Sequence, residues 1–460
     1  SLLNIVGKVY ARILLNRLKI LADRVYPESQ CGFRAGRSTT DMIFSLRQLQ
    51  EKSREQGQPL YMMFIDLTKA FDLVSRKGLF RLLQKIGCPP KLCSMVVSFH
   101  ANMQGTVLYD GSCSDPFSIK SGVKQGCVLA PTLFGIFFSV LLSHAFSTST
   151  DGVYLHTRSD GKLLNLARLR SKTKVRTVLL RDMLFADDAA LATHTVEALQ
   201  RLSDCFGNAC KLFGLTVSLE KTCVCAQGVS TPPAITMDNV LLKTVDSFTY
   251  LGSTVTNTLS LDAELDKRIG KANTTMARLT QRVWENRTLS LHTKVLVYRA
   301  CVLSVLLYGS ETWSTYVRQE RRLNAFHMRC LRRILGLSWK DKIPNSVILQ
   351  QAKIQSIYSI LSQRRLRWLG HVRRMEDGRI PKDVLYGQLA IGSRRVGRPA
   401  LRFKDACKRD MKACDISTDT WEVQAEDRTA WRRVVHHGVM EADKRRGEAA
   451  AEKRRQQKTV

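Results

Sequence analysis

The sequence predicts an α+β fold in which the strands lie between two helical parts of the chain. Helical patterns fill the first 56 residues and return from about Leu261 onwards. Between them, short apolar runs alternate with helical patterns, and this order indicates a sheet packed against helices. The 460 residues suffice for two to four domains of roughly 150 residues each. The hydrophobic content of 44% allows large buried cores.

The N-terminal part is predicted to hold two helices, a strand and a third helix. The first two helices flank a loop at 32–40, and apolar residues repeat at helical spacing in both. These positions are Val9, Ile13, Leu14 and Leu18 in the first helix, and Ile43, Leu46 and Leu49 in the second. Leu60–Ile65 has the composition of a buried strand. Ser75 can then cap a helix that runs to Gly87, where two prolines follow.

Two hairpins are predicted in the middle of the chain. The first pairs Val153–Arg158 with Lys162–Leu166 around an Asp-Gly turn. The second pairs Val178–Phe185 with Ala189–Thr193, which places Asp187-Asp188 at its turn.

The remaining elements are mainly helical. A helix is expected near 196–213, followed by short strands through Val255. From Leu261 the helical pattern dominates. The last low-complexity stretch, 444–458, is expected to be frayed or disordered.

The chain is strongly basic, with a net charge of +32. Residues 301–460 hold 34 Lys and Arg against 17 Asp and Glu, and residues 1–300 hold 38 against 23. The C-terminal third is therefore about twice as basic per residue as the rest. Such a charge favours polyanions, most often nucleic acid, although a merely solvated surface is the alternative.

The cysteines and the apolar runs indicate an intracellular protein. The thirteen cysteines form no CxxC pair and no zinc pattern. Neither a signal peptide nor an apolar run of about 20 residues is present, so a soluble protein of cytoplasm and nucleus is expected, without membrane contact. The chain begins at Ser1, which suggests a fragment of a longer reading frame.

Three carboxylates carry the most specific chemical signal. Asp66 ends the apolar strand Leu60–Ile65, and Asp187-Asp188 follows another apolar run. An unpaired carboxylate beside a packed core is costly, and its usual partner is a hard cation such as Mg²⁺. Two such ions stabilise the entering and leaving oxygens of a phosphoryl transfer. The alternative for the pair alone is a turn that faces water.

Five blocks resemble, in order, the palm motifs of the reverse transcriptases of non-LTR (LINE-type) retrotransposons. The resemblance spans residues 1 to about 256. The blocks are Phe64–Asp72, Ser121–Pro131, Phe185–Asp188, Gly214–Thr222 and Tyr250–Gly252, with a fingers motif upstream at Glu28–Asp41. The resemblance implies a right-hand polymerase with fingers and palm at 1–256, a helical thumb at 257–300 and a basic helical region at 301–443. The charged tail would occupy 444–460.

The resemblance also implies a metal site. Asp66, Asp187 and the main-chain carbonyl of Leu67 would hold two Mg²⁺ ions, with Mn²⁺ as a substitute. Asp188 would lie near the 3′ end of the primer. Lys221 would protonate the departing pyrophosphate, although a lysine that follows a glutamate is more often a surface cation.

Other residues would contact the nucleotide. Phe71 matches the ring that excludes a ribose 2′-OH, and an ordinary core aromatic is a compatible alternative. Gln125 and Gly126 match the segment against the incoming base and template, where glycine allows a close approach of the backbone. Arg34 and Arg37 are candidate phosphate clamps because a guanidinium suits bidentate contact. Structural loop arginines are about as plausible.

Contacts with the nucleic acid strands are expected further along the chain. Tyr250, Leu251 and Gly252 match the family's grip on the primer, whereas a plain strand end is the alternative. In the helix around 361–375, one apolar face leaves several arginines free for phosphate contact. The candidate nucleic-acid-binding residues are Arg364, Arg365, Arg367, Arg373, Arg374, Arg394, Arg395 and Arg398. A solvated amphipathic helix is the alternative.

The sequence thus predicts an RNA-directed DNA polymerase that extends a DNA 3′-OH on an RNA template with dNTPs. A catalytically inactive nucleic-acid-binding remnant of such an element is the main alternative. An RNA-dependent RNA polymerase is a third hypothesis, which Phe71 and the Phe185-Ala186 pair disfavour. Protein partners are not predicted.

Overall fold

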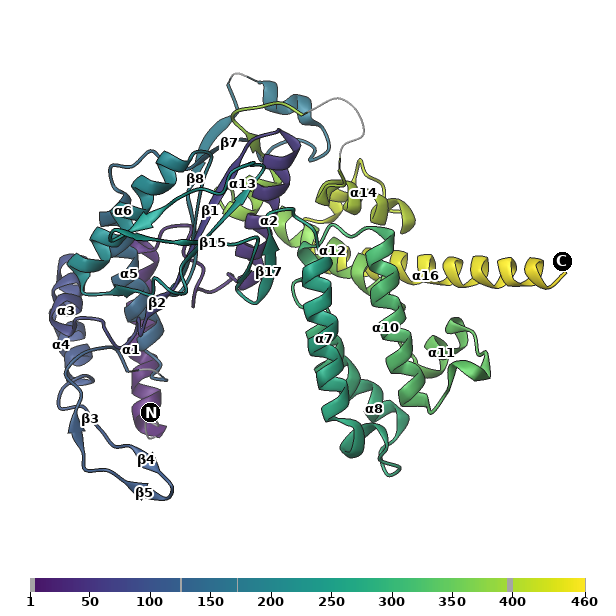
Figure 1. The fold of residues 1–460 in the computed structure, drawn as a ribbon, viewed down its shortest axis with the longest axis horizontal. Coiled ribbons are helices and arrows are strands. Elements are labelled where there is room, and N and C mark those ends of the chain that lie inside the picture. The colour runs from purple at the N-terminus through teal and green to yellow at the C-terminus, as the bar shows by residue number, and fades with distance from the viewer. Residues whose placement is uncertain (1–4, 125, 172, 395–399, 460) are drawn as a thin grey trace.

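The computed structural model describes residues 5–124, 126–171, 173–394 and 400–459. The candidate residues Gln125, Arg395 and Arg398 lie outside these ranges. Figure 1 shows a body of sheet and helices on one side and a group of helices on the other. The C-terminal helix projects away from both.

A five-stranded sheet forms the centre of the body, in the order β15-β12-β1-β10-β9. Its middle strand, β1 (Leu60–Ile65), pairs antiparallel with β10 (Asp188–Thr193) and with β12 (Cys223–Gln227). Outside them lie β9 (Asp182–Phe185) and the short parallel β15 (Lys243–Thr244). The predicted central strand is confirmed, and its apolar residues are buried because neighbours cover both of its edges and both of its faces.

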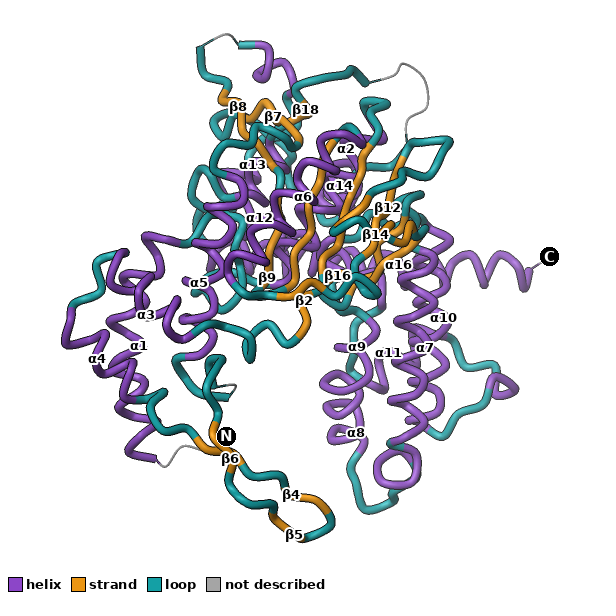
Figure 2. Tube along the Cα trace, turned by 60° about the vertical axis from the view of Figure 1, so that its left-hand side comes forward, coloured by secondary structure: helices purple, strands orange, loops and turns teal. Residues whose placement is uncertain are grey.

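Side chains of β1 alternate between two cores, as the period of two in a strand requires. Met63 and Ile65 belong to the core beneath α5 (Ala130–Phe146) and α6 (Val196–Phe213). Met62 and Phe64 face the opposite core, which α2 (Thr39–Glu55) closes. The sheet therefore lies between two helical layers, and the tube drawing shows this layering (Figure 2).

The N-terminal helices form where the sequence predicts them, but the buried face of the first helix differs from the predicted one. In α1 (Ile5–Val25), Val9 and Ile13 are 58% and 49% exposed, so the predicted apolar face is partly wrong. The buried face is turned because α1 packs on α5 through Ala11, Leu14, Leu15 and Leu18. As predicted, Ser75 caps α3 (Arg76–Lys85), its Oγ accepting from the Gly78 N–H at 3.2 Å. After it comes α4 (Pro90–Ser98).

A narrow arm leaves the body after α4. It consists of β3 (Gln104–Gly105) paired with β6 (Phe117–Ser118) and, at its tip, β4 (Leu108–Tyr109) paired with β5 (Ser112–Cys113). The arm projects beside the N-terminal end of α1 (Figure 1).

The predicted pairing of the first hairpin is wrong. β7 (Val153–Thr157) pairs with β8 (Arg176–Leu180) and with the distant β18 (Gln388–Leu389), not with 162–166. The segment 162–166 is instead drawn into another core: Leu163 is buried, and its N–H donates to the Glu422 carboxylate at 2.9 Å. The short helix η1 (Leu166–Arg170) follows.

Small strands complete the body next to the central sheet. They are β2 (Leu67–Thr68) with β11 (Thr216–Val217), β13 (Thr236–Met237) with β14 (Val240–Leu241), and β16 (Ser247–Tyr250) with β17 (Ser253–Thr256). β2 continues the chain directly after β1. Its pairing with β11 keeps the residues after β1 beside the segment that follows α6.

A second helical lobe follows the body and has its own core. It comprises α7 (Asp262–Arg278), η2 (Thr280–Trp284), α8 (Leu291–Val297), η3 (Tyr298–Leu303), α9 (Ser304–Leu306), η4 (Ser310–Thr312), α10 (Val317–Leu335), η5 (Trp339–Asp341) and α11 (Asn345–Ala352). The helical character expected from residue 261 onwards is confirmed.

The C-terminal helices return to the body. They are α12 (Ile357–Arg373), α13 (Ile380–Tyr386), α14 (Phe403–Ala413), α15 (Trp421–Gln424) and α16 (Arg428–Thr459). Their core includes Phe44 of α2, which lies edge-on to Trp368 and Phe403. Residues 444–459 continue α16 rather than forming the expected disordered tail, since Ala, Glu, Arg, Lys and Gln favour helix. In the described ranges, no helix combines the length and apolar character needed to span a bilayer.

Candidate active site

The turn between β9 and β10 places the acidic pair at the edge of the sheet. Phe185 pairs with Asp188, so the turn consists of Ala186 and Asp187 only. Ala186 adopts a left-handed conformation (φ +58°) that this tight turn requires. On the neighbouring strand, Ile65 is opposite Ala189, and the next residue of that strand, Asp66, therefore lies beside Asp188. The predicted meeting of the three aspartates is confirmed, although they come from segments 121 residues apart.

Repulsion among these carboxylates appears in their pKa values. Burial, and then the charges of Asp187 and Asp66, raise the pKa of Asp188 to about 6. Burial, and then the charge of Asp66, raise the pKa of Asp187. The third carboxylate is partly neutralised, because Lys221 Nζ lies 3.5 Å from Asp66 Oδ2. A cation near the pair would relieve the repulsion that remains.

The candidate metal ligands at this turn are oxygen atoms. Among the described residues, no group of three His, Cys, Asp or Glu side chains forms a ready-made cage. The residues that the resemblance implies are two carboxylates and the Leu67 carbonyl, all of them oxygen donors of the kind that Mg²⁺ prefers. Burial first, and neighbouring carboxylate charge second, raises the pKa of Asp187 and of Asp188, so a bound cation would stabilise their ionised forms. These residues therefore fit a hard divalent cation that is completed by ligand oxygens.

A loop after α1 fixes the turn that carries Asp187, and the sequence did not single it out for this role. The buried Gln30 side chain accepts hydrogen bonds from the N–H groups of Gly32 (2.8 Å) and Ala186 (2.9 Å) and donates one to the Ala186 carbonyl (3.0 Å). A Cβ at Gly32 would collide with the main-chain nitrogen of Ala186. The position of Asp187 therefore depends on residues about 155 positions earlier in the chain.

Phe71 lies at the junction between the sheet and α5. Its ring is half-buried and stacks on Phe134 with 4.3 Å between the ring centroids. Its carbonyl accepts from the Val123 N–H at 2.9 Å. Gly122 (φ +79°) passes so close to Asp72 that a Cβ would lie 2.7 Å from the Asp72 main chain. Residues 121–124 are thus held beside Phe71, and Gly126 is exposed with a positive φ of +81°.

The predicted primer grip forms a tight turn between β16 and β17. Leu251 and Gly252 both have positive φ (+47° and +79°), as a two-residue hairpin turn demands. The Tyr250 ring is buried, and its hydroxyl donates to the Met183 carbonyl at 2.8 Å. Tyr308 of the helical lobe donates to the Leu251 carbonyl at 2.8 Å. Tyr250 therefore anchors this turn to β9, while Leu251 is partly buried and Gly252 is exposed.

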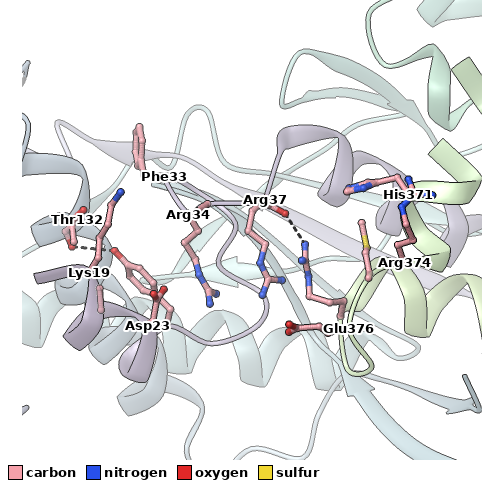
Figure 3. A pocket seen from close by; sticks show the side chains of 15 residues that line it. Lys19, Asp23, Phe33, Arg34, Arg37, Thr132, His371, Arg374 and Glu376 are labelled. Carbon is pink, nitrogen blue, oxygen red and sulfur yellow. Dashed lines mark hydrogen bonds between the residues drawn. The ribbon is translucent and has the colours of Figure 1, made fainter. Parts of the chain in front are cut away.

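Arg34 and Arg37 line a pocket of about 430 Å³ (Figure 3). Arg34 Nη1 donates to the carbonyls of Pro27 (2.9 Å) and Gln30 (3.1 Å), while Arg37 pairs with Glu28. Both are loop arginines with structural bonds, and both also face a cavity. The opposite wall of the pocket is formed by the end of α12 and the turn that follows it.

The C-terminal arginines fall into different classes. The prediction that Arg365 binds nucleic acid is wrong. Its side chain is fully buried, bonds to Asp410 at 2.7 Å and to the Trp313 carbonyl at 3.1 Å, and cannot reach a polyanion. Its position on the inner face of α12 explains this burial. Partly exposed arginines also have protein partners: Arg364 with Glu311, Arg373 with Glu426, Arg374 with the Ala425 carbonyl, and Arg394 with Glu55. Arg367 is exposed.

Comparison with known proteins places this site in a family. Residues 1–255 match the family described as reverse transcriptase (RNA-dependent DNA polymerase). The chain belongs to the reverse transcriptase family. The matched region contains all three aspartates and the loop that fixes their turn, so the resemblance seen in the sequence is confirmed. The chain accordingly has the right-hand polymerase fold of this family, and its division into fingers, palm and thumb stays a prediction.

Several curated relatives come from mobile elements. The RNA-directed DNA polymerase from mobile element jockey of Drosophila melanogaster is 26% identical over 350 residues, which cover 74% of this chain and 35% of the relative. The probable RNA-directed DNA polymerase from transposon BS, of the same species, is 24% identical over 388 residues, covering 81% and 40%. The chain thus spans about 35–40% of the length of these relatives. A telomerase structure from Candida tropicalis overlaps with a TM-score of 0.41 at 13% identity, covering 94% of this chain and 56% of that one.

Proposed function

We propose that this chain is the polymerase part of a non-LTR retrotransposon protein and copies an RNA template into DNA from a DNA 3′-OH. The observation that carries the proposal is the convergence of Asp66, Asp187 and Asp188 at one edge of the sheet. Its substrates would be dNTPs, and its cofactor two Mg²⁺ ions, with Mn²⁺ as a substitute. Such an enzyme would act in the cytoplasm and the nucleus, where its template and its DNA target lie.

The proposed reaction is an in-line attack of the primer 3′-oxygen on the α-phosphorus of a dNTP. The new P–O bond forms as the bond to the β-phosphate breaks, and pyrophosphate leaves. Divalent cations bound there would neutralise charge on the attacking and leaving oxygens. Asp66, Asp187 and the Leu67 carbonyl would hold these cations, and Asp188 would lie near the 3′ end of the primer.

The neighbouring residues take the remaining roles. Lys221, whose ammonium already lies beside Asp66, donates a proton to the departing pyrophosphate. Phe71, held against Phe134, limits space at the sugar and so selects dNTPs. Gly126 lets the backbone approach the incoming base, and Gln125 is assigned there by the sequence alone. The turn at Leu251-Gly252 would support the primer backbone. The assignment of Arg34 and Arg37 to the triphosphate stays a prediction.

Primer extension tests the proposal directly. Purified protein with Mg²⁺, dNTPs and a DNA primer annealed to an RNA template should extend the primer, and Asp187→Ala should reduce extension to background. Asp204→Ala, which changes an exposed carboxylate on α6, should retain full extension. An Asp187→Ala protein that still extends the primer would refute the site.

The same assay separates the alternatives. Incorporation of rNTPs as readily as dNTPs would identify an RNA polymerase instead. Tight binding of the primed template with no extension by the unsubstituted protein would favour the inactive remnant.

A further inference from the structure

The pocket of about 430 Å³ lies between two parts of the chain that are far apart in sequence (Figure 3). One wall comes from α1 and the loop after it, and the other from the end of α12 and the turn into α13. Its polar lining consists of Lys19, Asp23, Tyr26, Arg34, Arg37, Thr132, His371, Arg374, Glu376 and Arg379. None of the three catalytic aspartates belongs to the lining. The pocket is therefore separate from the reaction centre.

The lining is positive. Five Lys and Arg side chains face two carboxylates, so the formal charge of the lining is 5 − 2 = +3. Glu28 and Asp41, just outside the lining, compensate part of this charge, because Arg37 pairs with Glu28 and Arg379 pairs with both. Burial lowers the pKa of His371, so this side chain is not counted among the cations. Both walls contribute cations: Lys19, Arg34 and Arg37 from the first wall, and Arg374 and Arg379 from the second. An anion in this pocket would be held from both sides.

The cations are held in place but keep free donors. In their recorded bonds to described residues, Arg34, Arg37 and Arg374 each use only the terminal nitrogen Nη1. A guanidinium has five N–H donors, so several remain on each. Lys19 Nζ makes no ion pair or hydrogen bond with any of the described residues. The arginines are thus pre-oriented, and Lys19 is available for a ligand.

The pocket also contains aromatic surface that leads towards the catalytic turn. Phe33 is 51% exposed and held in a left-handed conformation (φ +58°). Its ring centroid lies 6.3 Å from that of Phe185, the residue just before the catalytic turn. The same loop carries Gln30, which bonds to Ala186. Proteins that bind single-stranded nucleic acid combine aromatic rings, on which bases stack, with cations that contact the phosphates. The exposed Phe33 ring beside several cations is such a combination.

We propose that this pocket binds the single-stranded RNA template just before it reaches the palm, and that the C-terminal segment 371–379 supplies half of the binding site. Phosphates of the template contact Lys19, Arg34, Arg37 and Arg374, while an unpaired base packs on Phe33. The end of α12 is thereby a template-binding element, even though it lies more than 100 residues beyond the part of the chain that matches the family. This inference rests on the proposed function as an RNA-templated polymerase.

A nucleoside triphosphate is the other phosphate source for the same cations. Its α-phosphate must lie beside Asp66 and Asp187 during the reaction, yet neither residue lines the pocket. A template strand has no such constraint, because it extends away from the reaction centre on the side of the next base to be copied. The position of the pocket therefore favours the template.

Binding of primed templates tests the proposal without requiring catalysis. Fluorescence anisotropy would compare the full chain on a DNA primer–RNA template duplex with a 5′ single-stranded RNA overhang and on the same duplex with a blunt end. The overhang should tighten binding. Lys19→Gln and Arg374→Gln should each remove about fivefold of that gain at 0.1 M salt, the loss expected for one contact with a salt slope of roughly 0.7. Binding of the blunt duplex should stay unchanged.

Matched variants separate a local role from general effects of charge and folding. Lys8→Gln on α1 and Arg329→Gln on α10 remove exposed cations outside the pocket and should leave the overhang effect intact. Arg374→Lys keeps the charge and should retain most of the effect, with a melting temperature equal to that of the unsubstituted protein. An overhang effect that persists in both Lys19→Gln and Arg374→Gln would overturn the proposal.

The two phosphate sources give different results. If the KM for dNTP rises in these variants while the overhang effect is unchanged, the pocket serves the triphosphate and the proposal is wrong. If overhang binding depends on the pocket but no primer is ever extended, the polymerase assignment fails while the pocket assignment stands.

Discussion

At the scale of single residues, the aspartates combine a functional position with a cost in stability. Asp188 keeps some contact with solvent, yet burial and the charges of Asp187 and Asp66 raise its pKa from 3.8 to about 6. Like charges at a functional site are common, because the ligand that binds there compensates them. The free protein should therefore be less stable than its fold would allow.

The pH dependence of this cost has a definite sign. Because the folded state holds the Asp188 proton more tightly than the unfolded chain, stability falls as pH rises from about 4 to 6, and the repulsion is complete above 6. Asp188→Asn should raise the melting temperature most at pH 8, less at pH 5 and little at pH 4. Thermal unfolding across this range, with Asp204→Asn as a control, measures the effect. An equal gain at pH 4 and pH 8 would contradict it.

Gln30 shows how one side chain can position a distant catalytic residue. Gln30→Ala leaves the N–H groups of Gly32 and Ala186 without their partner, which should lower the free energy of unfolding by about 2–4 kcal/mol. It should also lower kcat, since the turn that carries Asp187 is no longer fixed. Chemical denaturation and primer extension measure both. Gln84→Ala, on the exposed side of α3, should change neither.

At the scale of elements, α12 carries arginines with opposite roles. Arg365 is buried against Asp410 on one face, whereas Arg367 is exposed on the other. The helix therefore both holds the C-terminal core together and presents positive charge. The sequence predicts one apolar face for this helix, and that face is buried through Leu361, Trp368, Leu369, Val372 and Met375.

Substitutions at these two positions should have different consequences. Arg365→Gln removes the closer charge partner of the buried Asp410 carboxylate, leaving only Arg409 at 3.6 Å, and should lower the free energy of unfolding by about 3–5 kcal/mol. Arg367→Gln should leave stability unchanged and weaken RNA binding, with a smaller dependence on salt. Denaturation curves and binding isotherms at several salt concentrations compare the two. Equal loss of stability in both variants would contradict this division.

At the scale of the whole molecule, the C-terminal helices form part of the support of the palm. α2 is buried along most of its length, with the central sheet against one side and the C-terminal helices against the other. Charged residues within it have C-terminal partners: the Glu51 carboxylate accepts from the Phe403 N–H at 2.7 Å, and Lys52 Nζ donates to the Gly387 carbonyl at 2.6 Å. The domain limits predicted at residues 256, 300 and 443 remain predictions, but contacts across them are extensive.

Removal of one C-terminal side chain should therefore destabilise structure in the N-terminal half. Phe403→Ala removes the ring that packs on Phe44 and should cost about 3–5 kcal/mol of stability. Hydrogen exchange should accelerate in the amides of α2, more than 340 residues earlier in the chain. Phe117→Ala, at an exposed position on the arm, serves as the control. Unchanged exchange in α2 would show that the two parts are independent.

The sequence by itself determined the elements and the chemistry of the site. Apolar composition placed β1, a serine cap and a following pair of prolines placed α3, and helical spacing placed α6, because each of these signals lies within a short stretch of sequence. The three aspartates stood out because carboxylates next to apolar strands need a partner, and the order of the motifs identified the family.

Only the tertiary structure determined which distant segments contact one another. β7 pairs with β8 and β18, because pairing depends on which alternating strand lies beside it and not on the nearest turn signal. Arg365 and Arg367 differ only by which face of α12 meets the core. Gln30 bonds to Ala186 across more than 150 residues of sequence, and Lys19 and Arg374, more than 350 residues apart, line one pocket. Such contacts follow from the packing of the whole chain, and no local pattern encodes them.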